Sequence, residues 1–109
     1  MPASRLAGVP AILPALARAQ SQGERAARAG FDWPHVGGVV AKVGEELAEL
    51  QAAKTPEDKA REMGDLLFAM ANLARHLGVE PETALQAANA KFRRRFVGVE
   101  SRARAAGGG

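Results

Sequence analysis

The chain has 109 residues, of which 47% are hydrophobic and 25% charged, a balance typical of one globular domain. It contains no cysteine, which excludes disulfides and thiolate metal sites, and no apolar run long enough for a transmembrane helix. Prolines interrupt the apolar stretch near the start, which makes a poor signal peptide, so we expect a cytoplasmic protein without a membrane partner. The net charge is +3, but acidic residues gather between Glu45 and Asp65 and basic ones between Lys91 and Arg104.

Apolar residues recur at three- and four-residue spacing, which predicts helices and no strand. The expected helices cover residues 14–29, 34–53, 55–77 and 81–104. Pro14, Thr55 and Pro81 supply start signals, and Gly30 and Gly78 supply stop signals. Short connections favour antiparallel neighbours, so the fold class is all-α, of the four-helix bundle type. Residues 1–13 are an N-terminal extension, residues 14–104 a single domain, and residues 105–109 a glycine-rich tail expected to be disordered. A core this small favours self-association.

Two acidic pairs follow the apolar stripes of the second and third predicted helices. On a helical wheel Glu46 and Glu49 lie beside one stripe, Glu62 and Asp65 lie beside the other, and Glu45 faces solvent. If the stripes pack together, four carboxylates meet and repel one another unless a cation neutralises them. Mg²⁺ prefers such oxygen ligands. The spacing leaves a second interpretation open, in which both pairs belong to ordinary solvated helix faces.

The order of several motifs resembles the MazG-like nucleoside triphosphate pyrophosphohydrolases of the all-α NTP pyrophosphatase superfamily. The matching segments are Gly30-Phe31-Asp32-Trp33, Lys42-Val43-x-Glu45-Glu46-x-x-Glu49, Glu62-x-Gly64-Asp65-Leu66-Leu67-Phe68, Asn72-Leu73-Ala74-Arg75 and Asn89-x-Lys91-Phe92-x-Arg94-Arg95-Phe96. They are similar to the C-terminal catalytic half of two-domain members. Because this chain has one such half, regulatory roles of the longer proteins are not carried over.

The resemblance implies cleavage of NTPs or dNTPs between the α- and β-phosphates, giving a nucleoside monophosphate and pyrophosphate, with a role in clearing the nucleotide pool. It implies Mg²⁺, or Mn²⁺ in its place, and a homodimer or higher homo-oligomer whose subunits complete the core. The implied metal ligands are Glu46, Glu49, Glu62 and Asp65. Glu45 matches the remaining motif acid, which orients a ligand or helps to activate water, so Glu45 and Glu49 are the catalytic candidates.

Substrate contacts are expected mainly on the fourth helix. Asn89 falls on its apolar stripe, where a buried amide needs a partner, either a neighbouring helix or the nucleotide. Among the basic residues, the family pattern favours Lys91 with Arg94 or Arg95 as phosphate contacts. Trp33 either stacks on a base or anchors its loop, and Gln22 is a further base-contact candidate.

Three other functions remain open. In the first, the chain hydrolyses a more specialised nucleotide, such as dUTP or phosphoribosyl-ATP, although the flanking motifs weigh against the latter. Alternatively, the chain is a non-catalytic helical dimerisation module. A nucleic-acid-binding helix is a further interpretation of the basic cluster, but the carboxylates argue against it, so no nucleic-acid partner is expected.

Overall fold

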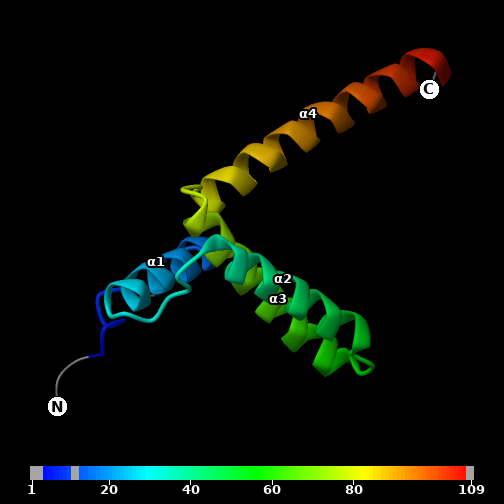
Figure 1. Cartoon of the computed structure of the whole chain (residues 1–109). Helices are drawn as coiled ribbons and strands as arrows, with labels where there is room; N and C mark the ends of the chain where they lie inside the picture. Colours follow the sequence, from blue (N-terminus) through cyan, green and yellow to red (C-terminus); the bar gives the residue numbers. More distant parts are fainter. Residues whose placement is uncertain (1–3, 11–12, 108–109) are drawn as a thin grey trace.

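The computed structural model describes residues 4–10 and 13–107, and within them it contains four helices and no strand (Figure 1). The helices are α1 (Ala15–Arg28), α2 (Val36–Ala52), α3 (Pro56–His76) and α4 (Pro81–Gly107). The predicted all-α class is therefore confirmed. The described helix α4 continues three residues beyond the expected end at Arg104, and Gly108 and Gly109 lie outside the described residues. None of these helices is long and apolar enough to span a bilayer.

Local chemistry explains where the helices begin and end. The Thr55 side chain accepts a hydrogen bond from the Asp58 N–H at 3.1 Å, and Pro56 occupies the first turn of α3, where no donor is lost. Gly78 follows α3 with φ of 71°, and Gly30 follows α1 with φ of 92°. Both values lie in the left-handed region that glycine adopts without strain, which is why the chain turns there.

The helices α2 and α3 form an antiparallel pair that lies side by side along most of its length, and α1 packs against α3 (Figure 1). The buried apolar residues of the described chain are Val39 on α2 and Ala69 and Ala71 on α3. Small side chains let these helices approach closely, but they build only a thin core. Most larger members of the predicted stripes, such as Leu47 and Leu67, stay about half exposed.

The last helix leaves the others instead of packing beside them. Figure 1 shows α4 projecting away from the α2–α3 pair, and its contacts within the described chain are with α1 and α3. The radius of gyration is 18.6 Å, against about 13 Å for a compact domain of this length. The expectation that α4 is an antiparallel neighbour is therefore wrong for the single chain. Its stripe, with Phe92 70% and Phe96 52% exposed, has no cover within the described chain.

Candidate active site

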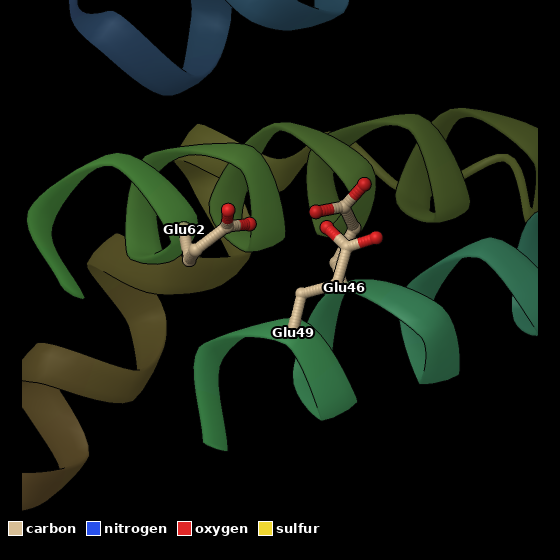
Figure 2. A group of neighbouring side chains, drawn as sticks. All are labelled: Glu46, Glu49 and Glu62. Carbon is tan, nitrogen blue, oxygen red and sulfur yellow. The ribbon is translucent and has the colours of Figure 1, made fainter. Parts of the chain in front are cut away.

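Three carboxylates meet between α2 and α3. Glu46 and Glu49 lie one turn apart on α2, and Glu62 lies on the facing side of α3 (Figure 2). One carboxylate oxygen from each of the three lies within 4.8 Å of the others. Glu46 is buried and Glu62 half-buried, so much of this negative charge is removed from water. The helix pairing that buries Val39 and Ala69 is what brings these side chains together.

The cations around the cluster compensate only part of its charge. Lys42 Nζ lies 2.9 Å from Glu46 Oε1 and 3.5 Å from Glu45 Oε1, and the pKa of Lys42 is raised chiefly by its hydrogen bond to Glu46. Arg61 is 3.7 Å from Glu62 Oε1. The other two oxygens, Glu46 Oε2 and Glu62 Oε2, are buried without a hydrogen-bond partner.

Such orphaned oxygens are costly unless something neutralises them. The pKa of Glu49 is raised, first by the charge of Glu46, then by desolvation and by Glu62. Mutually repelling carboxylates with unsatisfied oxygens are a donor set that fits a hard divalent cation. The residues present therefore suit the metal that the sequence implies.

Two predicted acids lie outside this group. Glu45 is exposed, as the helical wheel predicts, and its Oε1 lies 3.5 Å from Lys42 Nζ. Asp65 is exposed and is not among the oxygens that meet within 4.8 Å. It lies three residues after Glu62, and its side chain is one methylene shorter than that of glutamate. Its role as a fourth ligand remains a prediction.

The predicted substrate residues of α4 are not brought to the carboxylates within one chain. Four of them are exposed on the projecting part of the helix: Asn89, Lys91, Arg94 and Arg95. The helix α4 makes no contact with α2 in the described chain. Asn89 was expected on a buried stripe, but it is exposed because the stripe itself is uncovered.

A network that the sequence did not predict fastens the loop between α1 and α2 to α3. The Asp32 carboxylate accepts hydrogen bonds from Arg75 Nη2 at 2.7 Å and Nη1 at 3.2 Å, and it lies 2.8 Å from His76 Nε2. It also accepts from the Trp33 N–H at 2.9 Å. The hydrogen bond from Arg75 is the main reason that the pKa of Asp32 is held well below its usual range. This network fixes the position of Trp33.

The Trp33 ring anchors its loop, which is one of the two roles that the sequence left open, and base stacking remains a prediction. The ring lies against Gly38 at the start of α2, where an added Cβ would come within 3.4 Å of the ring. The side chain is nevertheless 45% exposed and lines a pocket between α1, the loop and α3. One part of Trp33 therefore anchors the loop, and another part is available to a ligand.

Comparison with known proteins decides the family. A protein-family model described as phosphoribosyl-ATP pyrophosphohydrolase matches residues 17–92, which include the three carboxylates, the Trp33 loop and Lys91. The chain belongs to this family. Within this pyrophosphohydrolase family the resemblance to MazG is also supported, since 45% of 97 aligned residues are identical to a Thermotoga maritima protein named "Nucleoside triphosphate pyrophosphohydrolase/pyrophosphatase MazG". The predicted resemblance is thus confirmed.

A second pyrophosphohydrolase relative gives the same result. The "Nucleoside triphosphate pyrophosphohydrolase" of Escherichia coli (strain K12) is 54% identical over 102 residues, covering 89% of this chain but 39% of that protein. The Thermotoga maritima match covers 38% of its protein. An uncharacterized Bacillus subtilis protein, YabN, is 52% identical over 46 residues. The chain thus spans well under half of the length of the curated relatives it matches.

Proposed function

We propose that this domain hydrolyses nucleoside triphosphates, ribo- or deoxyribo-, to a nucleoside monophosphate and pyrophosphate. The observation that carries the proposal is the cluster of Glu46, Glu49 and Glu62, with two buried oxygens that lack a partner. The names of the pyrophosphohydrolase relatives support the same reaction class. The carboxylate cluster gives no comparable support to a nucleic-acid-binding function.

Mg²⁺, or Mn²⁺ in its place, would be held by Glu46, Glu49, Glu62 and Asp65, and when bound it would neutralise the triphosphate oxygens and the leaving pyrophosphate. Asp65 would have to turn inward from its exposed position. The seam between α2 and α3 holds these carboxylates in place, since they project from two packed helices rather than from a loop. Lys42 holds Glu46 by its 2.9 Å contact and so orients the buried ligand.

The remaining groups handle water and protons. A water attacks the α-phosphorus, the bond from that phosphorus to the bridging oxygen breaks, and pyrophosphate leaves. We assign Glu49 as the group that takes the proton of this water, because it is the exposed member of the cluster and water can reach its carboxylate. Glu45, exposed beside Lys42, helps to hold that lysine on Glu46. No covalent enzyme intermediate is involved.

A second copy of the chain is part of the proposal. An isolated helix like α4, of 27 residues, gains most of its stability from packing, yet its Phe92 and Phe96 rings are exposed. The α2–α3 pair leaves a second apolar face uncovered, which includes Leu47, Met63 and Leu67. Self-complementary faces of this kind favour a twofold dimer. The partner's α4 would then cover that face and carry Lys91 and its neighbouring arginines toward the carboxylates.

A substrate panel tests the proposal. The protein is incubated with each NTP and dNTP, and with phosphoribosyl-ATP, in the presence of Mg²⁺, and the products are separated. We expect monophosphate and pyrophosphate as products. Glu62→Gln should lower the rate of hydrolysis by roughly 100-fold, as is typical when a group that stabilises a charged transition state is removed. Glu57→Gln, an exposed acid on the same helix, is the matched control and keeps full activity.

The outcomes separate the candidates. Turnover of phosphoribosyl-ATP alone would favour the specialised function after which the matching family model is named. Full activity of Glu62→Gln would exclude the carboxylate cluster as the metal site. A protein that binds itself but turns over none of the substrates would be a helical dimerisation module instead.

A further inference from the structure

Three arginines from two separate segments of the chain line one small cavity at the C-terminal end of α1. Arg25 and Arg28 belong to the last turn of that helix, and Arg5 belongs to a turn formed by residues 5–8. The cavity has a volume of about 180 Å³, and no described residue of α2 or α3 lines it. Figure 1 shows the N-terminal segment (dark blue) along α1. The cavity is therefore separate from the carboxylate cluster between α2 and α3.

A glycine lets Arg25 occupy this position. The Arg25 guanidinium lies so close to Gly8 that an added Cβ would be 2.5 Å from Nη1 and 2.6 Å from Cζ and Nη2. The Arg25 side chain is half-buried there, while Arg5 and Arg28 are exposed. The turn itself is closed by a hydrogen bond of 3.0 Å from the Ala7 N–H to the Ser4 carbonyl. Packing of Arg25 on Gly8 thus holds this turn against α1 and brings Arg5 to the cavity.

The positive charge around the cavity is compensated only in part. Arg28 Nη2 lies 4.0 Å from Glu24 Oε2, at the outer limit of an ion pair. In the part of the chain that the structure describes, no acidic side chain pairs with Arg5 or Arg25. Guanidiniums that share one cavity repel one another unless an anion lies between them. The cavity therefore has an excess of positive charge.

The end of α1 does not need these arginines as caps. Basic side chains near a helix C-terminus often bind its last carbonyls. Here the carbonyls of residues 25–27 accept hydrogen bonds from the backbone N–H groups of residues 29–31, at 2.9–3.2 Å. The backbone thus satisfies these carbonyls itself, and the guanidinium N–H groups remain for another acceptor.

We propose that this cavity binds a small, multiply charged oxyanion of the phosphate type, such as inorganic phosphate or pyrophosphate. The guanidinium presents several N–H donors in a planar fork that matches phosphate oxygens. The cavity is smaller than the about 300 Å³ at which sites for drug-sized molecules begin. Its four described lining residues include no aromatic ring on which a base would stack. The cavity therefore suits the anion and excludes a whole nucleotide.

Isothermal titration calorimetry of the full chain tests this site without any nucleotide or metal. The protein is titrated in EDTA, at about 0.1 M salt to screen distant charges, with phosphate, pyrophosphate and glycerol 3-phosphate. We expect saturable heat, with pyrophosphate bound more tightly than phosphate because it carries more charge. Glycerol 3-phosphate presents the same group on a larger molecule and should bind no more tightly than phosphate. Tighter binding of glycerol 3-phosphate than of pyrophosphate would overturn the assignment to a free anion.

Three variants make the test specific. Arg5→Gln should weaken pyrophosphate binding roughly tenfold, the scale of one hydrogen bond to a charged group. Arg18→Gln removes the same charge from an exposed position of α1 that does not line the cavity, and it should leave the affinity unchanged. Gly8→Ala keeps every charge, but its methyl group displaces the Arg25 guanidinium, so it should weaken binding as much as Arg5→Gln. Circular dichroism verifies that each variant is folded.

Four results would overturn the inference. The first is the absence of saturable heat with either inorganic anion. The second is an equal loss in Arg5→Gln and Arg18→Gln, because the protein would then respond to its overall charge. The third is full affinity in Arg5→Gln, which would place the anion elsewhere, and the fourth is full affinity in Gly8→Ala, which would contradict the place of Arg25.

Failure of this inference differs from failure of the proposed function. The titration contains neither a nucleotide nor a metal, and the variants change no residue of the carboxylate cluster or of α4. Hydrolysis of NTPs by a protein that binds no pyrophosphate in EDTA would leave the function standing and remove the anion site. Binding of pyrophosphate without hydrolysis would do the opposite.

Discussion

Glu62→Gln is expected to stabilise the metal-free protein while abolishing its stabilisation by Mg²⁺. In the wild type, oxygens of Glu62, Glu46 and Glu49 lie within 4.8 Å of one another. Two unit charges at that distance repel by about 3 kcal/mol at an effective dielectric constant of 20. Solvent around the half-buried Glu62 and its lost attraction to Arg61 reduce the gain. We expect a net gain of about 1–2 kcal/mol, or roughly 5–10 °C in melting temperature.

Stabilisation by Mg²⁺ should be lost in Glu62→Gln, although the metal-free variant is more stable than the wild type. A metal present at 100 times its dissociation constant stabilises a folded protein by about 2.7 kcal/mol. This stabilisation requires the same carboxylates that repel one another when the metal is absent. Thermal melts in EDTA and in excess Mg²⁺, at equal protein concentration, measure both quantities. Glu57→Gln should melt within about 0.5 kcal/mol of the wild type and keep its full response to Mg²⁺.

Two results would contradict the proposed repulsion or the proposed metal site. If Glu62→Gln melts below the wild type in EDTA, the carboxylates do not repel one another in the folded protein, and Glu62 has a structural role. If the variant is stabilised by Mg²⁺ as much as the wild type, the metal binds elsewhere.

Three further predictions follow from the same structure. Because the folded pKa of Glu49 is raised above its ordinary 4.5, the wild type in EDTA should lose stability as the pH rises through that folded pKa, and melts of Glu49→Gln should lack this step. Asp32→Asn breaks contacts to Arg75 and His76 and should cost about 1–3 kcal/mol. Since the pKa of Asp32 is depressed below its ordinary 3.8, urea titrations should show the full cost above that pH and a shrinking difference below it. Phe92→Ser should weaken self-association in sedimentation experiments without lowering helix content, and an unchanged sedimentation coefficient would contradict the proposed dimer.

Local signals in the sequence were sufficient for the helices and for much of the carboxylate cluster. Thr55 and Gly78 mark helix ends because caps and left-handed turns depend on nearest neighbours, and both act as predicted. The wheel separates Glu45 from Glu46 because helical spacing alone decides which face each residue occupies. Glu62 meets the α2 pair because the apolar stripes beside these acids determine how two helices pack.

Contacts between distant residues were beyond such reasoning. Asp32 and Arg75 are 43 residues apart, and no local pattern indicates that a loop carboxylate reaches a particular arginine. Asp65 has the spacing of a ligand, but spacing does not determine whether a short side chain reaches the cluster. For α4, an apolar stripe requires a cover but does not specify whether the same chain or a second copy provides it. Its departure from the bundle was therefore not predictable from the sequence.

Hydrolysis of ATP in ¹⁸O-labelled water, followed by ³¹P NMR in the presence of Mg²⁺, tests whether this domain cleaves between the α- and β-phosphates. We expect that AMP and pyrophosphate appear, that the label is found on the AMP phosphate because water attacks the α-phosphorus, and that EDTA stops the reaction. Formation of ADP and inorganic phosphate, label in pyrophosphate, or turnover that continues in EDTA would contradict it.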